Sequence, residues 1–240
     1  FNYNSAKKIS NYLEKVELPQ IIKPVDASGS KGVSVIHNLN ETKYKIERAF
    51  SESVSKTIII EKFISKKGSQ ICGDGWMENG KLKFVCYGDG HFYNDLRFLA
   101  PFGETFPSTH PREILDKVSE KLKKILNKVE YSNGPFNLDV IIDQNNEPFI
   151  IELGPRNGGN FIPDVIKLNT GVDLISASVE RIINKNFKLP VNHKKTKHFF
   201  ACYMVHSLEK GIYKDLVISR KIIDSIHKIN IYKKKGDSVE

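Results

Sequence analysis

The sequence is poor in cysteine and contains no long apolar run. Its three cysteines, Cys72, Cys86 and Cys202, are odd in number and lie far apart, with no spacing typical of a metal site. We therefore expect reduced, mostly buried thiols in a cytoplasmic protein, and no disulfide framework. No apolar run approaches the length of a membrane-crossing helix and no signal-peptide pattern opens the chain, so we expect no membrane partner.

Acidic residues are fewer than basic ones, and the net charge is +9. Such a charge is compatible with nucleic acid, with an anionic small molecule, or with a surface that is simply rich in lysine. The lysines are scattered, apart from one run at residues 233–235, and no aromatic-interleaved basic stripe or zinc-finger spacing is present. These observations argue against a nucleic-acid partner. Nothing in the sequence indicates an oligomeric state.

The chain has 240 residues and begins with Phe1, so we expect a fragment of a longer protein that is large enough for two lobes. Residues 1–64 are expected to form an α/β lobe, residues 65–194 a second lobe with antiparallel strands, and residues 195–240 a set of closing strands. Apolar periodicity predicts helices over residues 4–16, 41–54, 111–129 and 172–185. Strands are predicted over residues 18–23, 33–36, 57–61, 71–77, 82–87, 199–205, 216–218 and 229–232, and the strand at 57–61 is expected to be buried. Asn79-Gly80 predicts a hairpin turn, and an irregular loop is expected between residue 153 and the helix at 172–185.

The apolar stripes of three predicted helices can be read directly from their spacing. They are Ile46, Phe50 and Val54; Ile114, Val118, Leu122, Ile125 and Val129; and Ile175, Val179 and Ile182.

Two apolar runs lie on either side of a polar turn at residues 143–148, and each run carries one acid. Asp139 lies near the start of the first run and Glu152 near the end of the second. A β-hairpin here brings the two ends side by side. Two carboxylates with Arg156 just beyond suit Mg²⁺ bound to a polyphosphate, because Mg²⁺ takes one or two carboxylates and completes its shell with phosphate oxygens and water. The alternative is a solvated hairpin with no bound ion.

A glycine- and serine-rich loop follows the predicted strand that ends at Lys23. Ser28, Gly29, Ser30 and Gly32 allow a tight turn whose backbone N–H groups can bind an anion, and the Lys23 ammonium can reach the same phosphates. The spacing is not that of a Walker A motif. An ordinary turn is the alternative.

Polar residues also lie at the end of one predicted strand and at the start of the next. Residues 61–64 close a β-branched strand, and Gln70 and Asp74 follow on the next one. A strand that passes from one lobe to another can offer backbone groups to an adenine edge, and an acid or amide downstream can bind ribose hydroxyls. Alternatively, Glu61 is only a polar strand terminus.

Arg156 follows Glu152 in a segment rich in glycine and asparagine. An arginine here can stabilise the charge of a transferring phosphoryl group or bind a carboxylate with two hydrogen bonds. A structural ion pair with Glu152 or Asp164 is the alternative.

These segments, in this order, resemble the ATP-grasp superfamily. The likeness is greatest to the synthetase domains of carbamoyl-phosphate synthetase and to related carboxylate–amine ligases such as phosphoribosylamine–glycine ligase, and it covers roughly residues 18–190. It implies an α+β fold in which two α/β lobes with antiparallel sheets clamp a nucleotide between them. It also implies ATP and one or two Mg²⁺ ions as cofactors, with Mn²⁺ as a substitute.

The resemblance assigns a role to each candidate residue. Residues 61–64 would form the adenine hinge, and Gln70 would bind the ribose. The ATP-binding set would be Lys23, Ser28, Gly29, Ser30, Gly32, Glu61, Lys62, Phe63, Ile64 and Gln70. The metal ligands would be Asp139, Glu152 and Asn157, the catalytic residues Arg156 and Lys23, and the residues facing the acceptor substrate Asp89, His91 and Arg97.

The chain departs from the family pattern at three places. Gly154 stands where the pattern E-x-N-x-R has asparagine as a third metal ligand, so a second ion would be held more weakly, or by Asn157 or Asn137. Gln70 replaces the usual ribose-binding glutamate. A further phosphate-binding lysine or arginine of the family is expected upstream of Phe1.

The resemblance implies an ATP-dependent ligase that forms a C–N bond. A substrate carboxylate would attack the γ-phosphate, and an amine, or less readily a thiol, would displace the acyl-phosphate. Its small-molecule substrates cannot be named from the sequence. The alternatives are a phosphotransferase, a nucleotide-binding domain without turnover on the same fold, and a basic nucleic-acid-binding module.

Overall fold

The structure is a computed structural model that describes residues 6–93, 99–191, 197–207 and 209–239. The chain divides into two compact units, Phe1–Tyr203 and Met204–Glu240, and each is described by itself. No helix in the described ranges is long and apolar enough to cross a membrane. The division into residues 1–64, 65–194 and 195–240 stays a prediction.

The first part of unit 1 is a three-stranded antiparallel sheet in the order β2-β1-β3. Its elements are α1 (Ala6–Leu13), β1 (Gln20–Pro24), β2 (Ser34–Ile36), the 3₁₀ turn η2 (Leu39–Glu41), α2 (Thr42–Glu52) and β3 (Ile58–Lys62). Side chains alternate between the two faces of a strand. Ile22 and Ile58 therefore pack with the helices in a buried core, to which α1 contributes Ile9 and Leu13. Lys23, next to Ile22, projects from the opposite face.

The second part of unit 1 is a six-stranded antiparallel sheet in the order β8-β7-β4-β5-β6-β9. Its elements are β4 (Gln70–Glu78), β5 (Lys81–His91), β6 (Gly103–Phe106), α3 (Arg112–Lys128), β7 (Gly134–Ile142), β8 (Pro148–Gly154), α4 (Ile162–Thr170), α5 (Leu174–Ile183) and β9 (Phe200–Tyr203). The predicted Asn79-Gly80 turn is confirmed, and both residues have the positive φ, 50° and 73°, that a type I′ hairpin requires.

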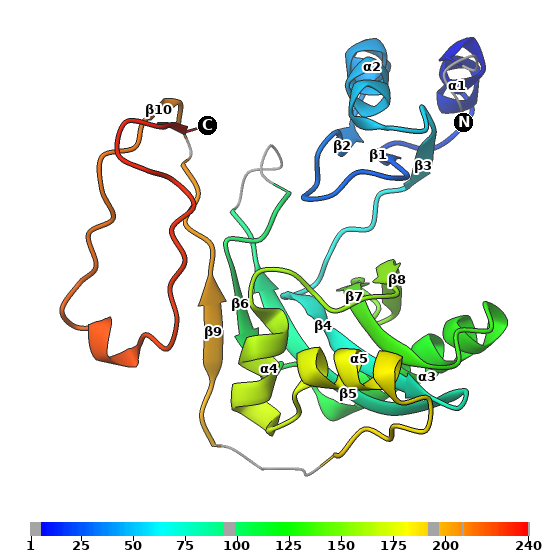
Figure 1. The fold of residues 1–240 in the computed structure, drawn as a ribbon. Helices are drawn as coiled ribbons and strands as arrows, with labels where there is room; N and C mark the ends of the chain where they lie inside the picture. The colour runs from blue at the N-terminus through cyan, green and yellow to red at the C-terminus, as the bar shows by residue number, and fades with distance from the viewer. Residues whose placement is uncertain (1–5, 94–98, 192–196, 208, 240) are drawn as a thin grey trace. The chain divides into compact units, whose positions relative to one another are not determined.

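The two faces of this sheet differ in chemistry. One face carries the apolar core, in which Val118, Leu122 and Leu126 of α3 pack with Leu138 and Val140 of β7. The other face carries polar residues and contacts α4 and α5, which lie over the strands in Figure 1. We call it the polar face, and define it by Gln70, Cys72 and Asp74 of β4, Asn137 and Asp139 of β7, Glu152 of β8 and Glu104 of β6.

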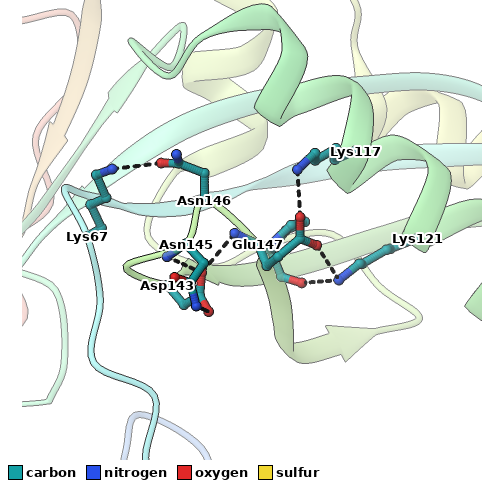
Figure 2. A network of polar contacts seen from close by, with 8 residues as sticks. Lys67, Lys117, Lys121, Asp143, Asn145, Asn146 and Glu147 are labelled. Carbon is teal, nitrogen blue, oxygen red and sulfur yellow. Dashed lines mark hydrogen bonds and ion pairs between the residues drawn. The ribbon is translucent and has the colours of Figure 1, made fainter.

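Salt bridges and hydrogen bonds fix the turn between β7 and β8 (Figure 2). Asp143 Oδ1 accepts from the backbone N–H groups of Asn145 and Glu147, at 2.8 Å in each case. Glu147 Oε1 lies 2.6 Å from Lys117 Nζ of α3, and Lys67 Nζ donates to Asn146 Oδ1 at 2.9 Å. The predicted turn is therefore tied to α3 through Glu147 and to the segment before β4 through Asn146.

Unit 2 contains little regular structure. Its elements are β10 (Gly211–Ile212), the 3₁₀ turn η3 (Ile223–Ser225) and β11 (Ser238–Val239), with β10 and β11 paired antiparallel. None of the residues described between 204 and 239 is buried. The predicted strands at residues 216–218 and 229–232 were wrong, because β-branched residues there have no neighbouring strand with which to pair.

The structure corrects several helix predictions. Helix α4 was not predicted. Its Ile162, Val165 and Ile166 stand at helical spacing and are buried, but Pro163 in the first turn resembles a loop residue. The stripe of α3 is Val118, Leu122 and Leu126, whereas Val129 lies beyond the helix end and is 63% exposed. Val54 likewise lies beyond α2 and is exposed.

The apolar side of α5 is also exposed. Ile175, Val179 and Ile182 share one side, as predicted, but that side faces away from the sheet, and Leu174 and Ala177 are buried instead. In β3 only Ile58 is buried, so the prediction of a buried strand was wrong.

Candidate functional site

Asp139 and Glu152 are direct partners in the antiparallel ladder between β7 and β8. Asn137 and Gly154 are partners two residues away in the same ladder. Side chains of directly opposite residues project to the same face, with Cβ atoms about 5 Å apart. The hairpin therefore brings two carboxyl groups together on the polar face, beside the amide of Asn137.

The two carboxyl groups of this pair lie in different environments. Asp139 is half-buried, and burial raises the pKa of its carboxyl to about 6, with Glu152 adding to the rise and a hydrogen bond from Gln70 opposing it. Gln70 Nε2 donates to Asp139 Oδ1 at 2.9 Å. Glu152 is 60% exposed, and its Oε1 lies 3.8 Å from Arg156 Nη2. A cation bound between the two carboxyl groups would stabilise both in their ionised forms.

The donor set at this pair fits a hard divalent cation. No group of three or more His, Cys, Asp or Glu side chains converges on a metal position in the described ranges. Two carboxylates are nevertheless enough for Mg²⁺, which keeps water and phosphate oxygens in its shell. Gly154 supplies no side-chain oxygen, but its ladder partner Asn137 places an amide on the same face.

Asp74, at the centre of the polar face, anchors the loop that carries Arg156. It is fully buried, and Asn137 Nδ2 and Gly158 N donate to its Oδ1, each at 2.9 Å. Burial raises the pKa of Asp74 to about 6, although both donors lower it. A Cβ on Gly158 would lie 2.8 Å from Asp74 Oδ1, so the close approach requires glycine. The sequence suggested a ribose contact for Asp74, whereas these contacts indicate a positioning role.

Arg156 and Asn157 lie in this anchored loop. Arg156 is 56% exposed, and its Nη1 donates to the Asn157 carbonyl at 2.9 Å. Asn157 Nδ2 donates to Ser178 Oγ of α5 at 3.0 Å, so the amide is directed towards that helix. Asn157 Oδ1 is buried and has no hydrogen-bond partner in the described structure. Metal binding by Asn157 stays a prediction.

The open face of the three-stranded sheet carries an ion pair between Lys23 of β1 and Glu61 of β3. The pair is diagonal across the ladder, since Glu61 lies opposite Ile21, and Ile59 lies opposite Lys23. Both charged side chains are partly exposed, at 23% and 42%. This face therefore combines a cation with the apolar surface of Ile21 and Ile59. Such a combination suits a nucleotide, with its flat base and its phosphates.

The loop after β1 has the backbone of a tight turn. Gly29, Ser30 and Gly32 have positive φ, and Ser28 and Gly29 are exposed. A Cβ on Gly32 would lie 2.8 Å from Pro24 Cγ, so this position needs glycine. Ser30 Oγ donates to the Leu99 carbonyl at 3.2 Å. Phosphate binding by this loop stays a prediction.

The segment between β3 and β4 contains the residues predicted to form the adenine hinge. Phe63 N donates to the Pro19 carbonyl at 3.2 Å, and Phe63 and Ile64 are partly exposed, whereas Lys62 is exposed. Lys67 N donates to the Ile142 carbonyl at 2.7 Å. The segment is thus tied to β1 at one end and to β7 at the other.

Asp89 and His91 do not lie beside Asp139. The alternation along β5 places both on the sheet face that packs on α3. There Asp89 is buried and accepts from Ser108 Oγ at 2.6 Å and Thr109 N at 2.8 Å, which lower its pKa despite burial. His91 Nε2 lies 2.9 Å from Thr105 Oγ1. Arg97 lies outside the described residues. Acceptor binding by these residues stays a prediction.

Sequence reasoning missed Glu104, a buried acid of β6 on the polar face. Its side chain is 5% exposed, and burial, with Asp139 and Asp74 nearby, raises its pKa to about 7. No apolar alternation or motif surrounds it in the sequence. Only the pairing of β6 with β5 and β9 places it beside the other acids.

Comparisons with known proteins agree with this geometry. A family profile described as "ATP-grasp domain" matches residues 16–164. The chain is 25% identical over 184 residues to a D-alanine–D-alanine ligase of Petrotoga mobilis, covering 72% of this chain and 57% of the relative. It is 24% identical over 185 residues to the carbamoyl phosphate synthase large chain of Sulfurisphaera tokodaii, covering 75% and 17%. The chain thus spans less than two thirds of either relative.

An L-amino acid ligase from Bacillus licheniformis has a similar fold, with a TM-score of 0.73 over 100% of this chain and 62% of that one, at 15% identity. The expected α+β ATP-grasp fold is therefore confirmed. From its profile match, which covers more than half of the sequence, we conclude that the chain belongs to the ATP-grasp family.

Proposed function

We propose that this chain is the nucleotide-binding part of an ATP- and Mg²⁺-dependent ligase that joins a carboxylate to an amine through an acyl-phosphate. The observation that carries the proposal is the pairing of Asp139 with Glu152, two residues before the end of β8, in a chain of the ATP-grasp family. Curated relatives named as carbamoyl phosphate synthase and D-alanine–D-alanine ligase support a ligase.

Each residue of the proposed site has a distinct task. Asp139 and Glu152 would hold Mg²⁺, which when bound neutralises charge on the phosphates. Arg156, exposed and next to Glu152, would stabilise the charge on the transferring phosphoryl group. Lys23 would bind phosphate oxygens. Since Lys23 is paired with Glu61 here, phosphate must compete with that carboxylate.

The remaining parts of the site would position the nucleotide. Loop residues Ser28–Gly32 would cover the phosphates, and residues 61–64 would contact the adenine. The side-chain amide of Gln70 would hydrogen-bond to both Asp139 and the ribose. A thiol as acceptor, Mn²⁺ as a substitute and a cytoplasmic location stay predictions.

A nucleotide-binding domain without turnover is the second candidate. Gly154 favours it, because the position of the family's third metal ligand lacks a side chain. It predicts Mg·ATP binding with no ADP release under any condition.

The experiment that separates the two is a screen for ADP release by the full-length protein. Carboxylates and amines are supplied in pairs with Mg·ATP, and each is omitted in turn. A ligase releases ADP and phosphate only when a matched pair is present and yields an amide. A stable phosphorylated product in place of the amide would identify a phosphotransferase. Tight Mg·ATP binding without ADP release across the screen would favour the non-catalytic domain.

A further inference from the structure

A row of four residues crosses the polar face from β4 to β9. Gln70 lies opposite Gly90, Gly90 opposite Glu104, and Glu104 opposite Cys202. Neighbouring strands are about 4.8 Å apart, so the backbones at Gln70 and Glu104 are separated by roughly 10 Å. Gly90 places no side chain between them. The row begins next to the proposed metal site, since Gln70 donates to Asp139.

Glu104 is a buried carboxyl group without a cation in the described structure. The Cys202 thiol donates to its carboxyl group, with Sγ 3.7 Å from Glu104 Oε2. The other two acids that are buried in the described part of the chain have hydrogen-bond donors. Gly158 and Asn137 donate to Asp74, and Ser108 and Thr109 donate to Asp89. Burying a carboxylate without a strong donor is costly, and a thiol is a weak one. A cationic ligand group would remove that cost.

The aromatic ring of Phe92 lies next to Gly90 in this row. A Cβ on Gly90 would come within 3.1 Å of Phe92 Cε2, so the ring lies at this glycine on the polar face. Lys66 Nζ lies 4.5 Å from the centroid of the Phe92 ring, so an ammonium group of a ligand would share the ring with Lys66 or displace it. A carboxylate beside an aromatic face is the chemistry that binds ammonium groups.

We propose that Glu104, together with the Phe92 ring, binds the ammonium group of the acceptor and thereby selects amines over thiols and alcohols. The inference rests on the proposed ligase function and assigns its acceptor class: a primary amine that is protonated near neutral pH. The distance across Gly90 places this ammonium beside, and not on, the carboxylates that would hold Mg²⁺.

The position also accounts for the proton balance of amide formation. Glu104 as a carboxylate takes one proton from the ammonium, which leaves a neutral amine. The amine nitrogen forms the bond to the acyl carbon while the bond from that carbon to the phosphate oxygen breaks. The second proton leaves the nitrogen with the departing phosphate, so that amide and hydrogen phosphate are the products.

The test begins with the wild-type protein and hydroxylamine, which is mainly neutral at pH 7.5 and needs no ammonium site. A carboxylate panel with hydroxylamine and Mg·ATP yields a hydroxamate for the accepted carboxylate. With no hydroxamate from any carboxylate, the proposed function fails, independently of Glu104. With the carboxylate known, primary amines replace hydroxylamine and the KM of the accepted amine is measured.

Glu104→Gln then tests the inference itself. We expect the KM for the amine to rise about 10- to 100-fold, the size of a lost charge-assisted hydrogen bond, while the Kd for Mg·ATP changes less than about twofold. Glu104→Asp keeps the charge and is expected to retain part of the affinity for the amine. The matched control is Glu120→Gln on the exposed surface of α3, where KM should be unchanged.

Two results would overturn the inference. One is an unchanged amine KM in Glu104→Gln. The other is a rise in the KM for the amine together with a fall in Mg·ATP affinity and in melting temperature, which would mean that Glu104 has a purely structural role. Where Glu104→Gln does not fold, Glu104→Asp decides the matter alone: an amine KM equal to that of the wild type overturns the inference, and a selective rise supports it.

Discussion

The backbone N–H of Gly158 lies 2.9 Å from each carboxylate oxygen of Asp74. This contact joins the middle of β4 to the loop after β8, residues 84 positions apart in the chain. Arg156 and Asn157 immediately precede Gly158, so the contact fixes the start of the loop that carries the proposed catalytic arginine. The first three predictions concern this contact.

Replacing Asp74 by alanine should destabilise the protein. It would leave Gly158 N and Asn137 Nδ2 without their shared acceptor in a buried site. Losing the partners of buried donors costs about 1–3 kcal/mol each, so we expect a total loss of roughly 2–6 kcal/mol in the free energy of unfolding. Urea unfolding at pH 7 measures it, and a loss below about 1 kcal/mol would contradict the anchoring role.

Gly158→Ala should be destabilising, and Gly159→Ala should not. A Cβ on Gly158 would lie 2.8 Å from Ile162 Cδ1 and 2.9 Å from Asn137 Nδ2, whereas a Cβ on Gly159 meets nothing within 4 Å. Overpacking of this kind typically costs about 1–3 kcal/mol. Thermal melting of the two variants checks the prediction, and equal melting temperatures for both would refute the close packing.

The stability of the protein without Mg²⁺ should fall as the pH rises from about 4 to 6. Burial raises the pKa of Asp74 from 3.8 to about 6, so the folded state binds more protons than the unfolded state in this window. The free energy of unfolding therefore decreases with pH. Asp74→Asn lacks this group and should show a shallower slope. Urea unfolding at several pH values compares the slopes, and parallel curves would show that Asp74 does not contribute.

Lys23→Ala should weaken Mg·ATP binding about tenfold or more, because a charge-assisted contact to phosphate is lost. The control is Lys43→Ala, an exposed lysine on α2, on the helical side of the same sheet. Calorimetric titration with Mg·ATP measures both. Equal affinity of Lys23→Ala and wild type would remove Lys23 from the site.

The hairpin and its acids could be predicted because their signals are local. The polar turn after Ile142 and the two apolar runs indicate the hairpin. The pairing of Asp139 with Glu152 also requires the register shift between Asp139 and Val140, which no local signal predicts. The role of Asp74 could not be predicted, since its partner Gly158 is distant in sequence. Glu104 was missed for the same reason: only strand order places it on the polar face.

The errors in the helices have a related cause. The periodic stripe of Ile175, Val179 and Ile182 predicted the helix correctly but not its orientation, because nothing in the sequence states which side meets the sheet. In α4, Pro163 stands in the first turn, where a helix tolerates proline, and was taken for part of a loop. In unit 2, β-branched residues predicted strands that found no partners.

The central claim is that Asp139 and Glu152 hold Mg²⁺ for phosphoryl transfer. The most direct test is Mg²⁺-dependent ADP release by Glu152→Ala and by Asp139→Asn, beside the control Glu120→Ala, with a substrate pair accepted by the wild type. We predict that both site variants lose ADP release by at least about a hundredfold, while the control retains it. ADP release at the wild-type rate in Glu152→Ala would contradict the account.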